Sequence, residues 1–159
     1  MADSPTVFIV DDDPAVQRAV GIVSKALGYP VRTFGKAADF LFGYEEGTPG
    51  VLVLDVRMPE MTGMELQKML ADAGVCIPVI MISGHADVRM AVQAMSQGAF
   101  TFLEKPIRMQ ELQECIQAAV ERNIEDQARQ QEQNEIRSRL ATLTQKEREV
   151  LDLLLDGHS

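Results

Sequence analysis

Short apolar runs that alternate with amphipathic helical segments are the feature of this sequence that most constrains its fold. Residues 7–10, 51–54 and 78–82 are almost wholly apolar and rich in β-branched side chains. Runs of this length without polar alternation are typical of strands buried on both faces of a parallel sheet. The runs at 31–34 and 99–103 predict two further strands.

Helical patterns separate these five predicted strands. Apolar side chains recur every three to four residues in four segments, and a fifth, shorter helix is predicted as well; the segments are 14–27, 36–42, 64–70, 88–97 and the stretch from 109 onward. Regular alternation of strands and helices predicts an α/β fold with right-handed crossovers. We therefore expect a doubly wound five-stranded parallel sheet, covered on both faces and complete within residues 1–122.

The remaining residues predict a linker and the beginning of a second domain. Segment 125–135 is highly polar and lacks glycine and proline, so residues 123–141 are expected to form a solvated helical linker, with a weak coiled coil as the alternative. Thr144 and Glu147 form a predicted capping box in front of a helix with a strongly apolar face. Since that face has nothing left in the sequence to pack against, residues 142–159 are interpreted as the N-terminal fragment of an all-α domain.

Charge and composition exclude several classes of protein. A net charge of −9 argues against non-specific binding to nucleic acids or membranes, which requires a basic surface. No N-terminal signal pattern is present and no apolar stretch approaches about 18 residues, so a cytoplasmic protein without a membrane segment is expected. Cys76 and Cys115 lack metal-site spacing and are expected to be buried free thiols.

Chemically matched side chains follow four of the predicted strands. Asp11 and Asp12 follow the first, Asp55 ends the central one, Ser83 ends the fourth and Lys105 follows the fifth. In open α/β sheets the carboxyl ends of the strands lie side by side and form the ligand site. These five side chains are therefore expected to meet at one edge of the sheet.

Such a group predicts a metal ion and a phosphoryl group. Neighbouring carboxylates repel one another unless a proton or a cation intervenes, and Mg²⁺ prefers one or two carboxylates together with waters and phosphate oxygens. Neither a serine–histidine pair nor a glycine-rich phosphate loop is evident. The available nucleophile is a carboxylate, which can form an acyl phosphate, while a lysine and a hydroxyl would orient the phosphoryl oxygens.

Four motifs in this order resemble the receiver domain of two-component response regulators. They are VFIVDDD, VLVLDVRMPEMTG, VIMISGH and FLEKP, and the resemblance covers residues 6–122. It implies a flavodoxin-like fold and phosphorylation of Asp55 by a sensor histidine kinase. It also implies that Mg²⁺ is bound by Asp12, by Asp55 and by the backbone carbonyl of Arg57, with Asp11 acting indirectly.

The same resemblance implies a conformational switch. Ser83 would bond to the phosphoryl group, Phe102 would turn inward behind it, and Lys105 would pair with Asp55 and then with the phosphate. The Lys105–Pro106 peptide bond is expected to be cis. Two residues depart from the common pattern: Ser83 stands where threonine is frequent, and Phe102 stands where tyrosine is frequent. Neither departure removes the hydroxyl or the aromatic packing that the switch needs.

The C-terminal stretch LTQKEREVLDLLLDGHS resembles the opening of a LuxR-type helix-turn-helix domain, as in regulators of the NarL/FixJ group. The resemblance implies a transcription factor in which phosphorylation controls DNA binding. Binding to DNA is expected through the full-length effector domain and not through this fragment, which lacks the recognition helix. A homodimer is expected when Asp55 is phosphorylated, and no membrane partner is expected.

Two other functions are compatible with parts of this sequence. A single-domain receiver acting through protein–protein contacts is the main alternative. A phosphohydrolase with an aspartyl nucleophile usually has a second acid two residues after it, where this chain has Arg57. The chain is therefore expected to be a switch that catalyses only its own phosphorylation and dephosphorylation. Arg57 and His85 are expected to modulate the phosphate lifetime by screening Asp55 from water.

Overall fold

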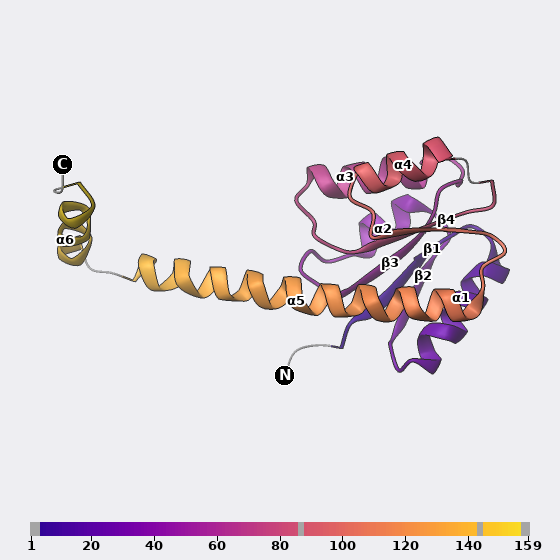
Figure 1. The fold of residues 1–159 in the computed structure, drawn as a ribbon, viewed down its shortest axis with the longest axis horizontal. Helices are drawn as coiled ribbons and strands as arrows, with labels where there is room; N and C mark the ends of the chain where they lie inside the picture. The colour runs from indigo at the N-terminus through magenta and orange to yellow at the C-terminus, as the bar shows by residue number, and fades with distance from the viewer. Residues whose placement is uncertain (1–3, 86–87, 143–144, 157–159) are drawn as a thin grey trace. The chain divides into compact units, whose positions relative to one another are not determined.

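The computed structural model describes residues 4–85, 88–142 and 145–156. The chain divides into two compact units, residues 1–125 and 126–159, which are treated separately below. The first unit contains the predicted α/β domain (Figure 1).

Five strands form one sheet in the first unit: β1 (Thr6–Val10), β2 (Val31–Phe34), β3 (Gly50–Asp55), β4 (Val79–Ser83) and β5 (Thr101–Glu104). Their order in space is β2-β1-β3-β4-β5, and every neighbouring pair is parallel. The predicted five-stranded parallel sheet is confirmed. Because β1 lies between β2 and β3, the winding changes direction at β1 and β3, which is where this fold class forms its ligand site.

Five helices cover the two faces of the sheet: α1 (Pro14–Ala26), α2 (Ala37–Gly43), α3 (Gly63–Asp72), α4 (Val88–Ser96) and α5 (Met109–Ala141). Side chains of α2, α3 and α4 pack on one face, and those of α1 and α5 on the other (Figure 1). In β3 the two faces share the residues alternately, since Leu52 and Leu54 join the first cluster while Val51 and Val53 join the second. All four are fully buried, which explains the unbroken apolar run.

Most element boundaries agree with the sequence predictions to within two residues. The fifth strand begins at Thr101 and not at Ala99. Gly98 has a φ of 97°, and the Ala99 N–H donates to the Ala94 carbonyl, so Ala99 belongs to the C-terminal turn of α4.

The two cysteines are free, but the prediction that both are buried is wrong. Cys76 is exposed and Cys115 is half-buried. Cys76 lies in the connection between α3 and β4, where its Sγ atom approaches the Gly74 carbonyl oxygen at 3.7 Å. Burial in this connection differs from residue to residue, since Ile77 and Pro78 are buried.

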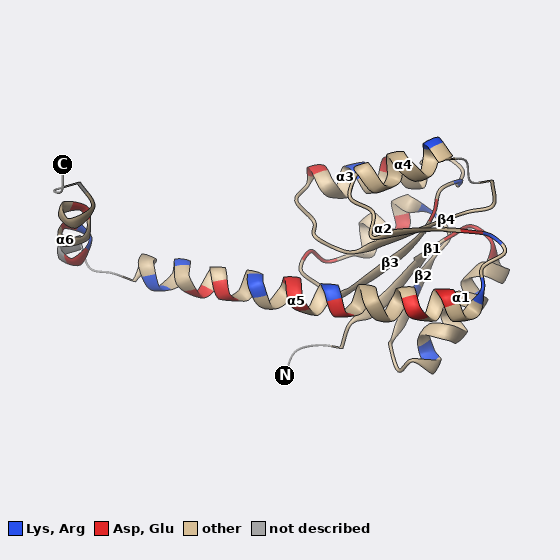
Figure 2. Ribbon diagram, viewed as in Figure 1, with Lys and Arg blue, Asp and Glu red and all other residues tan. Residues whose placement is uncertain are grey.

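The second unit contains the end of α5 and helix α6 (Gln145–Asp156). Acidic and basic residues are interspersed along residues 126–141 (Figure 2). Among them, Asp126 pairs with Arg129 at 3.3 Å. Five apolar side chains of α6 are exposed: Val150, Leu151, Leu153, Leu154 and Leu155. Thr144 of the predicted capping box lies outside the described residues, and the predicted domain boundaries at 122 and 141 stay predictions. Across the ranges that the structure describes, no helix has both the length and the apolar character needed to cross a bilayer.

Candidate functional site

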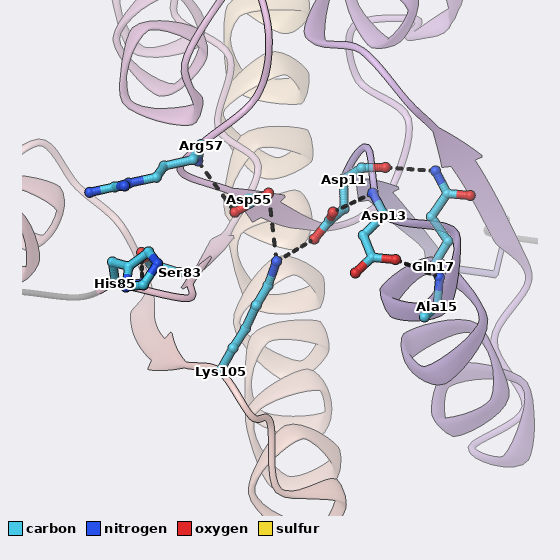
Figure 3. Close-up of polar contacts among 9 residues, drawn as sticks. All are labelled: Asp11, Asp13, Ala15, Gln17, Asp55, Arg57, Ser83, His85 and Lys105. Carbon is cyan, nitrogen blue, oxygen red and sulfur yellow. Dashed lines mark hydrogen bonds and ion pairs between the residues drawn. The ribbon is translucent and has the colours of Figure 1, made fainter.

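Acidic side chains from β1 and β3 meet a lysine from β5 at the carboxyl edge of the sheet. The Lys105 ammonium lies 3.1 Å from Asp11 Oδ2 and 3.6 Å from Asp55 Oδ2 (Figure 3). Asp11, Asp12 and Asp55 each offer one oxygen, and these oxygens lie within 4.8 Å of one another. The structure thus brings together four of the five side chains that the strand ends predict, from three different strands.

The backbone and the carboxylate of Asp11 are both held by hydrogen bonds or ion pairs. Its N–H donates to the Phe34 carbonyl of β2 (3.1 Å), and its Oδ1 accepts from the Asp13 N–H (2.8 Å). Asp13 in turn is the N-cap of α1, where its side chain accepts from the Ala15 N–H (2.9 Å). Pro14 follows at the first helical position, where its missing N–H costs no hydrogen bond. The three consecutive acids therefore have different roles: Asp13 caps helix α1, while Asp11 and Asp12 belong to the acidic group with Asp55.

The connection after β3 brings the chain back over Asp55. Glu60 has a φ of 72°, and the Gly63 N–H donates to the Val56 carbonyl (2.9 Å). A Cβ atom on Gly63 would collide with the carbonyl oxygen of Asp55, so this position requires glycine. Thr62 then caps α3 by accepting from the Glu65 N–H. The spacing between Asp55 and Gly63 is therefore explained by a tight return of the backbone onto the acid.

The electrostatic environment of Asp55 disfavours its charged form. Its side chain is 5% exposed. Burial, followed by the neighbouring charge of Asp11, raises the pKa of Asp55 from 3.8 to about 6, although Lys105 and the Arg57 N–H act in the opposite direction. Burial alone would lower the pKa of Lys105, but its bonds to Asp11 and Asp55 outweigh that effect and raise it. One lysine therefore compensates the acids only in part.

The acidic group has the chemistry of a site for a hard divalent cation. All three donors are carboxylate oxygens, the ligand type that Mg²⁺ prefers. Ligands about 2.1 Å from Mg²⁺ lie up to about 4.2 Å apart, so oxygens within 4.8 Å of one another suit direct ligation combined with bridging waters. Asp12 is exposed, which leaves the group open to solvent. The residues present fit the predicted metal.

The other predicted site residues lie on or next to the neighbouring strands β3, β4 and β5. Ser83, fully buried at the end of β4, accepts the His85 N–H at its Oγ (3.2 Å). The Arg57 N–H donates to Asp55 Oδ1 (3.3 Å), while its side chain extends away from the carboxylate (Figure 3). Phe102 is half-buried and packs against the core cluster that contains Met81.

Lys105 follows β5 directly, and its backbone is hydrogen-bonded to the end of β4. The Lys105 N–H donates to the Ser83 carbonyl (2.8 Å), and the Lys105–Pro106 bond is cis, as expected. The backbone bond thus joins the end of β4, where Ser83 lies, to the residue whose ammonium lies 3.6 Å from Asp55 Oδ2.

Sequence reasoning missed Gln17. Its side-chain Nε2 donates to the backbone carbonyl of Asp11 at 2.6 Å, although residue 17 belongs to the apolar-periodic segment of α1 and carries no recognisable motif (Figure 3). The only available signal was a long amide side chain four residues after the N-cap, where it can reach back to the preceding loop.

Comparison with known proteins agrees with this geometry. The family model described as the response regulator receiver domain matches residues 7–117. The transcriptional regulatory protein TdiR of Thauera aromatica is 40% identical over 157 residues, covering 99% of this chain and 69% of the relative. The transcriptional regulatory protein FixJ of Rhizobium meliloti is 41% identical over 152 residues, covering 96% and 74%.

Solved structures give the same result. The response regulator StyR has a TM-score of 0.89 at 37% identity, covering 99% of this chain and 79% of that one. The structure titled FixJ-N has a TM-score of 0.65 at 39% identity, covering 75% and 95%. The resemblance seen in the four sequence motifs is confirmed, and the chain belongs to the response regulator receiver family, whose similar members here are transcriptional regulators.

Proposed function

We propose that this chain accepts a phosphoryl group from a sensor histidine kinase on Asp55, in a Mg²⁺-dependent reaction, and thereby controls DNA binding by a C-terminal effector domain. The observation that carries the proposal is the bridge that Lys105 makes between Asp11 and Asp55 at the carboxyl edge of the sheet. This bridge brings the buried nucleophile Asp55, the Lys105 ammonium and the acidic side chain of Asp11 together. The chain acts as a switch and catalyses only its own phosphorylation and dephosphorylation.

The transfer is a displacement at phosphorus. A carboxylate oxygen of Asp55 forms a bond to the phosphorus as the bond to the kinase histidine nitrogen breaks, which leaves an acyl phosphate on Asp55 and returns the electron pair to the imidazole. Lys105 is 3.6 Å from the carboxylate before transfer, within reach of a phosphoryl oxygen afterwards. Since catalysis of this transfer depends on positioning and charge stabilisation, the fixed lysine lowers the barrier.

The acidic group would hold the metal. Asp12, Asp55 and the backbone carbonyl of Arg57 are the proposed direct ligands, and Asp11 acts indirectly through its bond to Lys105 and through water. Bound Mg²⁺ supplies positive charge that offsets the carboxylates and the phosphoryl oxygens. Asp55 must be ionised to attack, and a pKa of about 6 leaves it mostly ionised at neutral pH.

Ser83 and Phe102 are the proposed switch residues. The Ser83 hydroxyl can donate to a phosphoryl oxygen, since in the present structure it accepts from the His85 N–H. Ser83 pairs with Glu104 and Met81 with Phe102 in the β4–β5 register, so movement at Ser83 reaches the aromatic side chain through adjacent strands. We propose that this reshapes the surface formed by α4, β5 and α5, and that the phosphorylated chain forms a homodimer there. Val88, Val92 and Met95 of α4 are exposed on it.

The remaining assignments follow from the family and from the C-terminal sequence. The two relatives are longer than this chain, which spans 69% and 74% of them. DNA binding is assigned to the effector domain of a full-length regulator, and not to this fragment. That effector domain would begin near residue 142, with α6 as its first helix. A cytoplasmic location is part of the same proposal.

Arg57 and His85 are proposed to adjust the lifetime of the phosphoryl group by limiting the approach of water. Both lie beside the site, with backbone contacts to Asp55 and Ser83. Replacing either with alanine is expected to change the dephosphorylation rate by about 2- to 10-fold, equivalent to about 0.4–1.4 kcal/mol in the barrier. Unchanged phosphate lifetimes in both variants would contradict this role.

Incubation with Mg²⁺ and a small acyl phosphate tests the main proposal. The wild-type chain should incorporate one phosphate, the Asp55→Asn variant none, and the Asp39→Asn variant, altered at an exposed acid on α2, as much as wild type. Removal of Mg²⁺ by a chelator should abolish incorporation in the wild type. Equal incorporation in the wild type and in Asp55→Asn would remove Asp55 from its role.

A further inference from the structure

We propose that Gln17 is a positioning residue for the divalent cation, acting through the backbone that joins Asp11 to Asp12. Its Nε2 donates to the Asp11 carbonyl oxygen at 2.6 Å, slightly shorter than the usual range of about 2.7–3.2 Å for such bonds. The inference rests on the proposed function, because it concerns the metal that the acidic group would hold. No motif of the family resemblance includes this residue.

The position of Gln17 on α1 explains how it reaches the loop. Asp13 is the N-cap, so Gln17 is the fourth helical residue, and its N–H donates to the Asp13 carbonyl (3.1 Å). Side chains of a helix tilt toward its N-terminus. A glutamine here therefore extends back over the turn that carries the acids. Only its NH₂ group can donate to a carbonyl, so the orientation of the amide is set by chemistry.

The bond replaces a strand partner that the sheet lacks at this point. In a strand the N–H and C=O of one residue point to the same side, and the Asp11 N–H points to β2, where it bonds to the Phe34 carbonyl (3.1 Å). Strand β2 ends at Phe34. The Asp11 carbonyl therefore points to where β2 has ended, beside Gly35, where an added Cβ atom would lie 4.0 Å from Gln17 Nε2. The Gln17 amide occupies this place.

Holding this carbonyl orients both acids. The Asp11 carbonyl belongs to the peptide unit that joins Asp11 to Asp12, and that unit is planar. Fixing its oxygen therefore fixes the direction in which the chain leaves Asp11 and the Cα of Asp12 follows. Asp11 is also fixed by Phe34, Asp13 and Lys105, whereas Asp12 is exposed on the loop. Gln17 is thus placed to define the position of Asp12, the more exposed of the two acids.

The expected consequence is a weaker affinity for Mg²⁺ when the bond is lost. Residues that orient metal ligands without touching the metal typically change affinity by about 10- to 100-fold. Because Gln17 acts through one peptide unit on an exposed site, we expect an effect of about 10-fold. Gln17 is half-buried, so water can solvate the released carbonyl and the fold should persist.

Two variants test the bond. Gln17→Met keeps the length of the side chain but removes the donor, and Gln17→Asn keeps the amide but shortens its reach by one methylene. Gln113→Met changes an exposed glutamine of α5 in the same way and serves as the matched control. The measurement is the Mg²⁺ dissociation constant by titration calorimetry on the full chain, with the thermal unfolding midpoint recorded without metal.

Both Gln17 variants should bind Mg²⁺ about 10-fold more weakly than wild type, with Gln113→Met unchanged. The amide resonance of Asp12, which lies in the held peptide, should also shift in ¹⁵N spectra recorded without metal. Dissociation constants within about 2-fold of wild type in either folded variant would overturn the role of Gln17. If Gln17→Met does not fold, the Asn variant decides.

A further variant, Asp12→Asn, separates this inference from the proposed function. If the wild type binds Mg²⁺ and Asp12→Asn loses binding while the Gln17 variants retain it, the metal site stands and the Gln17 inference fails. If wild type and Asp12→Asn bind Mg²⁺ equally, the proposed metal site itself fails, and the inference fails with it.

Discussion

Asp55 shows how strongly position changes the chemistry of one side chain. It ends a fully buried strand, and its carboxylate shares one lysine with Asp11. Burial and Asp11 together raise its pKa to about 6. A proton or a cation at this site therefore stabilises the fold, and the same electrostatics that favour metal binding make the metal-free protein sensitive to pH.

The metal-free protein should lose stability as the pH rises through about 6. The native state holds the Asp55 proton more tightly than the unfolded chain does, because the pKa of Asp55 is near 3.8 in the unfolded chain. The stabilisation that this proton gives the native state is therefore fully present below pH 3.8, and it is lost as the pH passes about 6. The change from 3.8 to about 6 corresponds to at most about 3 kcal/mol.

Asp55→Asn removes the free-energy cost of ionising the buried Asp55 carboxyl group at neutral pH. The variant should raise the free energy of unfolding at pH 7 by up to about 3 kcal/mol relative to wild type, with the difference vanishing below about pH 4. Urea denaturation at both pH values, in the presence of a chelator, measures it. A difference that is equal at both pH values would show that ionisation of Asp55 is not its source.

Gly63 is a second residue whose identity follows from the site. Gly63→Ala places a Cβ against the Asp55 carbonyl, and should lower the free energy of unfolding by about 1–3 kcal/mol and slow phosphate incorporation. Gly21→Ala is the control. Gly21 lies inside α1, where its added Cβ would be 3.9 Å from Val31, an ordinary contact distance, and where alanine favours the helix over glycine by about 1 kcal/mol. Equal stability of both variants would contradict the close approach at Gly63.

At the scale of elements, α5 is joined to β3 by one buried polar contact. Asn123 is 1% exposed, and its Oδ1 accepts the Gly50 N–H at 3.0 Å. Gly50 begins the strand that ends at Asp55, and a Cβ there would collide with the Thr6 carbonyl. The last buried residue of α5 thus ties the helix to the start of the central strand.

Asn123→Ala leaves the Gly50 N–H buried without its acceptor. The free energy of unfolding should fall by about 1–3 kcal/mol, measured by chemical denaturation. The matched control is Asn134→Ala at an exposed position of the same helix, which should change stability by less than about 0.7 kcal/mol. Similar effects in the two variants would mean that the contact with Gly50 contributes little.

At the scale of the whole molecule, the receiver core is complete before the second unit begins. Neither hydrophobic cluster includes a described residue beyond Val120, and beyond Asn123 the described side chains of α5 are exposed or half-buried. The exposed apolar side chains of α6 belong to the second unit. The two units therefore have separate requirements for stability.

A chain ending at residue 125 should fold and unfold cooperatively, with a thermal midpoint within about 2–4 °C of the full chain, as expected for a change near 1 kcal/mol. A chain ending at residue 108 loses four buried apolar side chains, Leu112, Ile116, Ala119 and Val120, and should show no cooperative transition. Calorimetry of both tests this. A large loss of stability in the longer fragment would show that residues 126–159 support the receiver.

The sequence by itself determined the order of strands and helices and the residues that end the strands. Strands buried on both faces need continuous apolar runs, and the alternation of these runs with helices leaves few arrangements other than a parallel sheet. Local patterns encode strand ends, so the sequence alone assigns five residues to one edge of the sheet: Asp11, Asp12, Asp55, Ser83 and Lys105.

Only the tertiary structure decided how those side chains interact. Distances between Lys105 and two acids, the raised pKa of Asp55 and the exposure of Cys76 depend on groups far apart in the sequence. The contacts of Gln17 with Asp11 and of Asn123 with Gly50 left no recognisable pattern, since a single polar side chain on a helix reads as a surface residue. Periodicity reports which face of an element is buried, whereas a hydrogen bond between elements depends on their relative placement, which exists only in the folded chain.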